Sequence, residues 1–490
     1  MASLSDRFVP PEGSDNPLIY VVAEAPGQEE DSQLRPLIGR SGQLFRSALE
    51  ELGLTLDKVR LFNTVPYRPL EDDNKSNRTP SQEEILEYRE IVKQDIRLCN
   101  PKSILCLGGT AASALTDIFD WSVGAFASNH TFKFEDIPIR VCWHPSYILR
   151  QGGSSGHQYN KWLSQIKEAI IAASPSILKD QNTEEMKFDI YYPDKIDEFL
   201  NKFEDAELIG YDIEGSSLET LSKDFHIAGI SFARSGYAAY MAFKHFDNYD
   251  GIIEDSIKLK IKEFLGRNQN KVAVFNLCYE VPASFNIFNI ELLRLQDTMQ
   301  YCRVLNWTGG LKEISALYLN ERRWTDYHNE WLINLTNVIN LTKPRWRKGV
   351  KYQNYYMQII ESDGFNNVIK KYEDQESLAC EEDSSINVTS LSVEELKNIK
   401  RKYNHINDKD TSLITSLKYI KDTAYLYNIP EDRTWINLLK ILQESHEIGS
   451  TEAKFTQSPA ELVGEYCCRD SWNTRRLHEL TIYELTKRSA

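Results

Sequence analysis

Glu207-Leu208-Ile209-Gly210-Tyr211-Asp212-Ile213-Glu214 is the stretch that decides the fold of the second half of this chain. Apolar residues followed by alternating acids predict a buried strand that ends at the edge of a sheet. Because residues two apart on a strand point to the same face, Asp212 and Glu214 are expected to project side by side. Two adjacent carboxylates repel each other and favour a divalent cation between them. The alternative interpretation is a solvated strand end followed by a Gly-Ser turn.

Length and composition predict a protein of several ordinary domains. A chain of 490 residues is typical of about two to four domains, each with its own core. No apolar run approaches the ~20 residues of a membrane span. The first residues, Met1-Ala2-Ser3-Leu4, lack the apolar core of a signal peptide. We therefore expect an intracellular, cytoplasmic protein that does not contact a membrane, in the host cytoplasm if the source is a phage.

Charge and cysteine usage narrow the class further. The net charge of −15 argues against a protein that coats nucleic acid through its overall charge. A nuclease remains compatible with it, because local basic grooves can coexist with an acidic, metal-loaded site. The eight cysteines form no CxxC pair, which favours reduced thiols over a disulfide framework.

The order of predicted elements divides the chain into two α/β domains. Residues 1–173 alternate strands with helices, which predicts a mostly parallel sheet covered by helices. A polar stretch at 174–187 is expected to be a linker. The second domain, 188–490, begins with three closely spaced strands that suggest an antiparallel meander. A mostly helical insertion is expected at about 321–460.

Further acids follow the opening pair along the chain. A strand ends at Asn276, and Glu280 lies four residues later, while Tyr466 and Asp470 share one helical face at i and i+4. Four carboxylates can hold two Mg²⁺ or Mn²⁺ ions, which would orient a water for attack on phosphorus and stabilise the leaving 3′ oxygen. Tyr466 can align that water or the scissile phosphate. The predicted metal ligands are Asp212, Glu214, Glu280 and Asp470.

These motifs resemble the DEDD-type 3′–5′ exonuclease superfamily in its tyrosine-containing branch, and most closely the proofreading domain of family A DNA polymerases. Asp212–Glu214 matches the first motif, Asn276–Glu280 the second and Tyr466–Asp470 the third, with similar intervening segments at Asp297–Met299 and Leu311–Asn320. The resemblance implies a ribonuclease H-like fold and proofreading-type hydrolysis of DNA. Glu280 departs from the family, which usually has Asp there. The long interval before Tyr466 implies the inserted helical segment.

A basic and aromatic stretch lies within the predicted insertion. In Lys343–Tyr356, basic side chains can neutralise phosphates while aromatic rings stack on bases. The alternative is a solvated loop with one packed ring. The predicted DNA contacts here are Arg345, Trp346, Arg347 and Lys348.

In the first domain, polar residues follow three predicted strands. Glu24, Asn63 and His144 each come just after an apolar run, where α/β domains assemble their sites. An acid that positions water, an amide that reads a base edge and a histidine that stabilises charge on the base suit the excision of a flipped base. The sequence therefore predicts a second candidate site.

These segments resemble the uracil-DNA glycosylase superfamily, nearest its family 4 branch. The matching segments are Ala23–Gly27, Arg35–Gly42, Ile104–Ala112 and His144–Arg150, with Asn63 at the uracil-reading position. The resemblance implies a parallel-sheet sandwich, with Arg40 and Arg150 as DNA contacts.

This domain also departs from its family. Family 4 members carry four cysteines that hold an iron–sulfur cluster, but this chain has no cysteine before Cys99, and Tyr67 replaces one ligand. We therefore expect no iron–sulfur cluster. Leu37 stands where the family has a Phe that stacks on uracil. An active, cluster-free glycosylase is favoured, and a domain that binds DNA or uracil without cleavage is the alternative.

The two resemblances together suggest a DNA repair and replication protein similar to the front half of certain bacteriophage family A DNA polymerases. Single-stranded 3′ ends and uracil-containing DNA are the expected substrates. No polymerase motif follows Asp470, so the polymerase is expected as a separate partner chain or as a part missing by truncation. A non-catalytic DNA- or protein-binding module with decayed sites is the alternative class.

Overall fold

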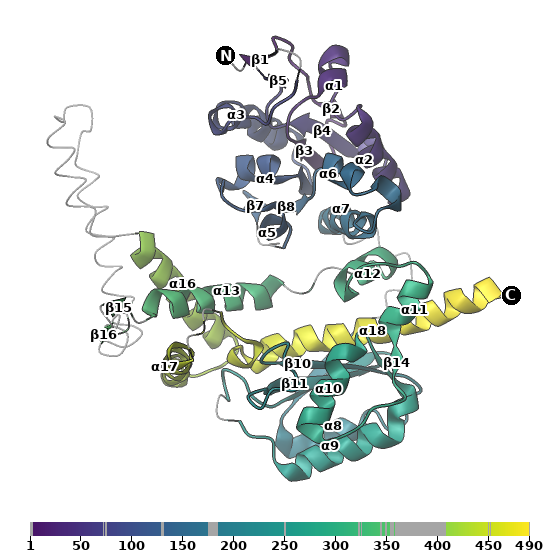
Figure 1. The fold of residues 1–490 in the computed structure, drawn as a ribbon, viewed down its shortest axis with the longest axis vertical. Helices are drawn as coiled ribbons and strands as arrows, with labels where there is room; N and C mark the ends of the chain where they lie inside the picture. The colour runs from purple at the N-terminus through teal and green to yellow at the C-terminus, as the bar shows by residue number, and fades with distance from the viewer. Residues whose placement is uncertain are drawn as a thin grey trace. The chain divides into compact units, whose positions relative to one another are not determined.

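The computed structural model divides the chain into two units (Figure 1). It describes residues 3–489 apart from 72, 74–75, 129–131, 175–184, 249–250, 322–323, 325, 344, 348–349, 353–356, 358–407, 449 and 451. The first unit comprises Met1–Glu185, Thr298–Asp326 and Arg476–Ala490, and the second comprises Met186–Asp297 and Tyr327–Arg475. Two distal segments thus group with the first unit, whereas the predicted domains were continuous. Most of the predicted linker lies outside the described residues.

The first unit contains a six-stranded, mostly parallel sheet. Its order is β2-β4-β3-β6-β8-β7, and the four central strands are parallel. Short antiparallel strands close both edges. The strands are β2 (Glu12–Gly13), β3 (Ile19–Ala23), β4 (Val59–Asn63), β6 (Ser103–Leu107), β7 (Lys133–Phe134) and β8 (Ile137–Cys142).

Helices cover both faces of this sheet, because its strands are apolar on both sides. Ile19 and Val21 pack in one core with Trp162, whereas Tyr20 and Val22 pack in another with helix α3. The helices of the first core are α2 (Arg40–Glu51), α6 (Pro145–Arg150) and α7 (Tyr159–Ala173), and those of the second are α3 (Gln82–Cys99), α4 (Gly109–Thr116) and α5 (Val123–Ser128). The predicted α/β class is confirmed for this unit.

Two later helices, α11 (Thr298–Val304) and α12 (Leu311–Tyr318), also belong to the first unit, as does the C-terminal segment Arg476–Ala490. Lys167 on α7 donates a hydrogen bond of 2.6 Å to the carbonyl of Leu317, which ties α12 to the α7 face.

The second unit is built on a mixed six-stranded sheet with the order β14-β13-β10-β11-β12-β9. The central strands β10, β11 and β12 form the predicted antiparallel meander, while β13 runs parallel to β10 and to β14, and β9 runs parallel to β12. Their bounds are β9 (Lys187–Tyr191), β10 (Ile209–Gly215), β11 (Ile227–Arg234), β12 (Tyr237–Ala242), β13 (Val272–Val274) and β14 (Gln296–Asp297).

The two faces of this sheet are covered differently. Ile209, Tyr211 and Ile213 of β10 pack against helices α8 (Ile196–Asn201), α9 (Asp255–Asn268) and α10 (Leu277–Phe288). The other face packs against the long helix α18 (Ala460–Ser489), with Val463 and Cys467 in the core. Because strand side chains alternate, the remaining residues of β10 face α18.

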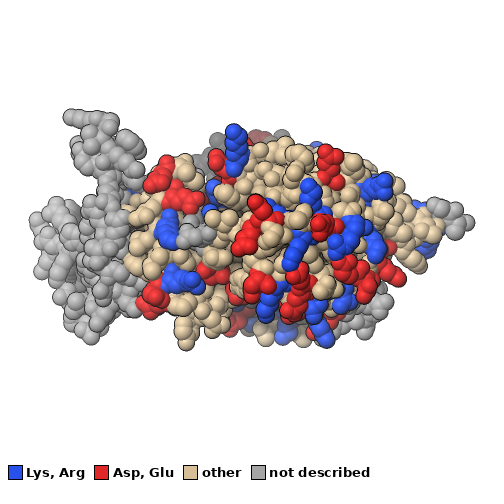
Figure 2. Space-filling view, turned by 90° about the horizontal axis from the view of Figure 1, so that it is seen from below, with Lys and Arg blue, Asp and Glu red and all other residues tan. Residues whose placement is uncertain are grey.

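The described parts of the predicted insertion are mainly helical. Helices α13 (Asp326–Thr342), α16 (Asp408–Leu426) and α17 (Glu431–Glu447) share a core built on Trp331, Leu417 and Leu438. A short hairpin pairs β15 (Arg345–Arg347) with β16 (Val350–Tyr352). Among the described helices, none combines the length and the apolarity needed to cross a membrane. Acidic and basic side chains are interspersed on the face drawn in Figure 2. The described residues of this face therefore form no large patch of a single charge sign.

Candidate active sites

The site in the second unit arises where β10 and α18 approach closely. At Gly210, an added Cβ would lie 2.0 Å from the carbonyl oxygen of Ser471 and 3.1 Å from Cβ of Arg475. Only glycine allows this approach, because any side chain would collide with helix backbone. The next two residues of β10 on this face, Asp212 and Glu214, therefore lie directly against α18.

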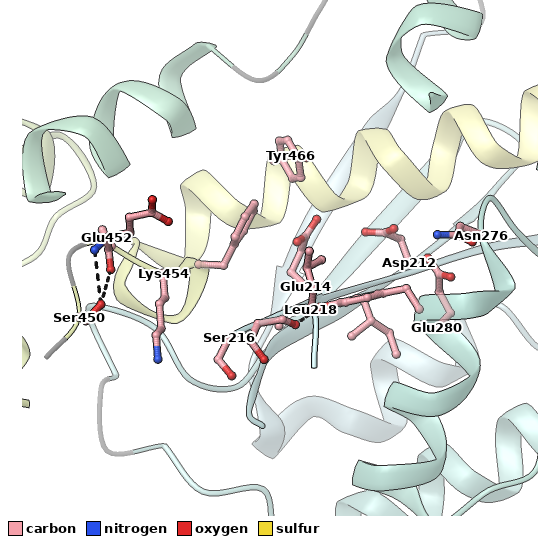
Figure 3. A pocket seen from close by; sticks show the side chains of 16 residues that line it. Asp212, Glu214, Ser216, Leu218, Asn276, Glu280, Ser450, Glu452, Lys454 and Tyr466 are labelled. Atoms are coloured by element: carbon pink, nitrogen blue, oxygen red, sulfur yellow. Dashed lines mark hydrogen bonds between the residues drawn. The ribbon is translucent and has the colours of Figure 1, made fainter. Parts of the chain in front are cut away.

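A cluster of ligand-type atoms forms at this contact. One carboxylate oxygen of Asp212, one of Glu214 and Sγ of Cys467 all lie within 4.8 Å of one another. The Cys467 thiol donates a hydrogen bond of 3.1 Å to Oδ2 of Asp212. Figure 3 shows the carboxylates of Asp212 and Glu214 between the strand and the helix that carries Tyr466. The predicted side-by-side placement of the two acids is confirmed.

Glu280, in the first turn of α10, also lies close to Asp212, and its side chain lines the same cavity. Its side chain is 5% exposed, and Oε2 has no hydrogen-bond partner among the described residues. Burial raises the pKa of Glu280 well above its usual range, and the charge of Asp212 raises it further, followed by those of Asp297 and Asp470. A buried carboxyl with an unused oxygen beside another acid is suited to receive a cation.

Tyr466 lies over this cluster on α18. Its ring packs on Phe455 and His328, with centroids 5.6 and 5.5 Å away. Burial, followed by the charges of Asp470, Glu214 and Asp212, raises the pKa of Tyr466 well above its usual range. The hydroxyl therefore stays protonated and can donate a hydrogen bond at neutral pH.

These side chains line one cavity of about 640 Å³. The structure brings four predicted residues to it, namely Asp212, Glu214, Glu280 and Tyr466. Asp470 is buried one helical turn beyond Tyr466 and does not line the cavity. Its charge still acts on both Glu280 and Tyr466.

The other wall of the cavity was not predicted. Ser450 and Glu452–Phe455 line it, with Lys454 as the only cationic residue among the described lining residues. Leu218, which follows β10, also lines the cavity although its side chain is 88% exposed. No motif in the sequence marks these residues, and Ser450 and Glu452–Phe455 reach the cavity only because the loop before α18 packs there. Cys467 was not predicted either, and it lies at the helix contact beside Asp212 rather than in the cavity lining.

The predicted DNA-binding stretch is only partly described. Arg345, Trp346 and Arg347 form β15 of the short hairpin, and Lys348 lies outside the described residues. DNA contact by these four residues stays a prediction.

In the first unit, the predicted polar residues lie at the carboxyl edge of the parallel strands. Glu24 follows β3, Asn63 ends β4 opposite Ala23, and His144 follows β8 by two residues. Since β4, β3, β6 and β8 are adjacent and parallel, their carboxyl ends meet at one edge. The sheet therefore brings the three residues to the same side of the unit.

Glu24 is oriented by the helix that follows β6. Oγ1 of Thr110, on α4, donates a hydrogen bond of 2.9 Å to Oε2 of Glu24. Burial raises the pKa of Glu24, and this hydrogen bond lowers it in part. The result is a half-buried carboxylate with one oxygen held in place.

Asn63 and His144 have different environments at the same edge. Asn63 is 2% exposed, and its Nδ2 has no hydrogen-bond partner among the described residues. His144 caps α6, with Nδ1 2.8 Å from Oγ of Ser146. Burial, followed by the charge of Arg150, lowers the pKa of His144 to about 4. The imidazole is therefore neutral at physiological pH, and the amide of Asn63 has a donor to spare.

The loop before α2 is tightly constrained. Leu37 adopts φ +52° and is 5% exposed, and a Cβ at Gly42 would lie 2.1 Å from the Leu37 carbonyl. Arg40 and Arg150 are both exposed, and their contact with DNA stays a prediction.

Comparison with known proteins agrees with this geometry. Residues 10–167 match the model of the uracil DNA glycosylase superfamily. A type-4 uracil-DNA glycosylase of Thermotoga maritima is 34% identical over 139 residues, which cover 28% of this chain and 70% of that protein. The chain belongs to the uracil-DNA glycosylase superfamily. The type-4 enzyme of Pyrobaculum aerophilum is 30% identical over 154 residues, covering 30% of this chain and 76% of that protein.

A further relative extends beyond the glycosylase domain. A DNA polymerase of Bacillus phage SP01 is 23% identical over 496 residues, which cover 95% of this chain and 49% of the polymerase. The chain therefore spans about half the length of that relative, and both units lie within the similar region.

The iron–sulfur cluster of family 4 does not fit the residues of this glycosylase domain. Such a cluster takes four cysteine thiolates, whereas Tyr67 packs between Phe8 and Tyr88 with centroids 5.7 and 5.3 Å away. Aromatic rings thus occupy the place predicted for a ligand, and a protein without the cluster stays our prediction.

Proposed function

We propose that the chain is a DNA-processing enzyme with two activities, a metal-dependent 3′–5′ exonuclease in the second unit and a uracil-DNA glycosylase in the first. The observation that carries the exonuclease proposal is the convergence of Asp212, Glu214, Glu280 and Tyr466 on one cavity. The antiparallel meander followed by parallel strands beside β10 supports a ribonuclease H-like domain. Similarity to a phage DNA polymerase across both units supports DNA as the substrate.

The acidic residues suit a divalent-ion site. Asp212, Glu214 and Glu280 would hold Mg²⁺ or Mn²⁺. Asp470, which does not line the cavity, would add negative charge next to these ligands. Bound divalent ions supply charge neutralisation for the attacking and leaving oxygens of phosphoryl transfer. Tyr466 keeps its proton and donates a hydrogen bond toward the cavity, which orients the water or the scissile phosphate.

The remaining wall of the cavity suits a DNA 3′ end. Lys454 supplies a positive charge for a phosphate, while Leu218 and Phe455 offer apolar surface to a base. A single-stranded end is favoured, because an unpaired base can reach such side chains while a stacked base pair cannot.

Hydrolysis of 3′-labelled single-stranded DNA tests the exonuclease. The expected result is Mg²⁺- or Mn²⁺-dependent shortening that is lost in Asp212→Ala and kept in the control Asp205→Ala, whose side chain is exposed and outside the cavity. Undiminished shortening by Asp212→Ala would sink the assignment of this cavity.

The glycosylase proposal rests on the edge formed by Glu24, Asn63 and His144. The spare donor of Asn63 can bond a carbonyl oxygen of uracil, and the neutral imidazole of His144 can donate to an oxygen that gains charge as the base leaves. The Glu24 carboxylate, held by Thr110, can position water or stabilise the cationic sugar. The buried Nδ2 of Asn63, which has no hydrogen-bond partner among the described residues, is costly unless a ligand satisfies it.

Release of uracil from DNA, followed by alkaline cleavage of the abasic site, tests this activity. Wild-type protein should release uracil, and Asn63→Ala should lose most of the rate, since removing a hydrogen bond to a transition state typically costs about 10²–10³-fold. Retained binding of uracil-DNA with no release by wild type would support the alternative of a binding domain without cleavage.

The relation to a polymerase follows from the same comparison. We propose that the two activities serve DNA synthesis by a polymerase domain, in a longer form of this chain or in a partner chain. Uracil removal and 3′-end trimming are both corrections of newly made DNA. Co-purification with a polymerase, or a chain extended beyond Ala490 in the source, would test this proposal.

A further inference from the structure

Cys467 occupies a position that the proposed exonuclease chemistry does not use. Its side chain is fully buried on α18, and Sγ lies 3.1 Å from Oδ2 of Asp212. One carboxylate oxygen of Glu214 completes a group whose three atoms lie within 4.8 Å of one another. A thiol in an otherwise all-oxygen site changes which ions the site prefers, since thiolates select soft cations while Mg²⁺ prefers oxygen.

A second observation at the same place points to a cation. Oε2 of Glu280 is buried and has no hydrogen-bond partner among the described residues, and Glu280 lines the cavity next to Asp212 (Figure 3). An acceptor left without a donor at this depth is costly. A positive ion between α10, β10 and α18 would satisfy it together with the carboxylates.

We propose that this site also takes a soft divalent cation, Zn²⁺ or Cd²⁺, with Cys467 Sγ as a ligand beside Asp212 and Glu214, and that such an ion displaces the Mg²⁺ or Mn²⁺ that supports hydrolysis. On binding, the S–H bond of Cys467 breaks, a sulfur–metal bond forms, and the proton passes to solvent. Zinc sites take sulfur at about 2.3 Å and carboxylate oxygen at about 2.0–2.2 Å in a tetrahedral shell. The atoms of the group are near enough for one ion once the carboxylates turn toward it.

The consequence is inhibition of the proposed exonuclease by soft ions. A thiolate ligand holds Zn²⁺ or Cd²⁺ in a geometry unlike that of the oxygen-bound Mg²⁺. Only this consequence rests on the proposed exonuclease function, because the binding of the soft ion is measured without any DNA.

Direct binding of Cd²⁺ to the full chain tests the inference. The background variant Cys278→Ser/Cys380→Ser removes an exposed thiol and a thiol that lies outside the described residues, and Cys467→Ser is compared with Cys468→Ser in that background. Cys468 is also fully buried on α18 but lies outside the ligand group, which makes it a matched control. Cadmium–thiolate bonds absorb in the ultraviolet, so the band reports Cys467 directly, and calorimetry gives the affinity.

The Cys468→Ser protein should show the thiolate band, and Cys467→Ser should lose it. Cys467→Ser should also bind Cd²⁺ at least about 10–100-fold more weakly, the loss typical when a group that supports a metal site is removed. Asp212→Asn, which keeps the shape of the side chain, should also weaken Cd²⁺ binding if Cys467→Ser fails to fold. An equal band and equal affinity in Cys467→Ser, or full affinity in Asp212→Asn, would overturn the inference.

Hydrolysis measured in parallel separates the two proposals. A Cys467-dependent cadmium band without Mg²⁺- or Mn²⁺-dependent DNA shortening would support the soft-ion site and refute the exonuclease proposal. If Zn²⁺ inhibits DNA shortening equally in Cys467→Ser and Cys468→Ser, the exonuclease proposal is supported and the role of Cys467 is refuted.

Discussion

Gly210→Ala is the sharpest test of how the second unit forms its cavity. Gly210 lies on β10 between Ala233 of β11 and Ala273 of β13, so the strand is held on both sides. An added Cβ would meet backbone of α18, with the carbonyl oxygen of Ser471 at 2.0 Å and its carbon at 2.9 Å. Because the obstacle is backbone, no side-chain rotation relieves the clash, and strand and helix must separate.

The size of the effect follows from these distances. The Ser471 oxygen has to move from 2.0 Å to at least the 3.4 Å of an ordinary van der Waals contact. Overpacking of this kind typically costs about 1–3 kcal/mol of folding free energy. The same displacement moves Tyr466 and Cys467 away from Asp212, and a shift of about 1 Å in a reacting group can lower a rate by about 10²-fold. We expect a larger loss of exonuclease rate than of stability.

Thermal unfolding and single-turnover shortening of DNA measure the two effects separately. The control is Gly266→Ala on α9, where the nearest atom to an added Cβ is Cδ1 of Ile290 at 3.9 Å. That substitution should keep the rate and stabilise by up to about 1 kcal/mol, as alanine does in a helix interior. If Gly210→Ala hydrolyses DNA at the wild-type rate, the close approach of β10 and α18 is not what positions the site.

Three other predictions concern single side chains. Thr110→Val removes the hydrogen bond that lowers the pKa of Glu24, so the acid limb of the pH profile of kcat/KM for uracil release should move to higher pH; an unchanged profile contradicts the pairing. In metal-free protein, folded Glu280 has a pKa above its usual 4.5, so the unfolded state loses its proton first and the free energy of unfolding falls as pH rises above 4.5. Glu280→Gln should abolish that part of the pH slope, and equal slopes in chelator-treated melts of the two proteins would refute it. Tyr88→Ala removes the ring contact with Tyr67 and should lower the stability of the first unit by at least the ~0.5–1.5 kcal/mol of an aromatic pair, whereas an iron chelator should leave the wild-type melting temperature unchanged.

Much of the fold was predictable because its signals are local. The apolar runs that became β3, β4, β6 and β8 are separated by segments long enough for covering helices, and three of them, β3, β4 and β8, lead directly to the polar residues Glu24, Asn63 and His144. Parallel strands then bring Glu24, Asn63 and His144 to one edge without any knowledge of tertiary contacts. In the same way, the period of two along β10 was sufficient to place Asp212 and Glu214 on one face.

The rest of the second site depends on contacts between distant segments. Lys454 and Phe455 line the cavity because the chain before α18 passes beside β10, which no local pattern encodes. The grouping of Thr298–Asp326 with the first unit likewise depends on packing such as the Lys167–Leu317 hydrogen bond. Asp470 shares a helical face with Tyr466 as predicted, but the cavity ends before reaching it.

The pairing of β10 with α18 explains why the sequence pointed to Tyr466 and missed Cys467. Gly210 meets Ser471, and two strand residues later Asp212 meets Cys467, four helix residues earlier. Two residues of strand span about 6.6 Å and four residues of helix about 6.0 Å. In an antiparallel strand–helix pair, every second strand residue therefore meets every fourth helix residue. The helix residues that face the strand are therefore four apart and include Ser471 and Cys467. Tyr466 and Asp470 each lie one position to the side, and of these two only Tyr466 lines the cavity. A residue inserted between Cys467 and Ser471 would turn the first part of the helix by about 100° and remove both the thiol and the phenol from the acids, whereas the sheet itself would keep its order.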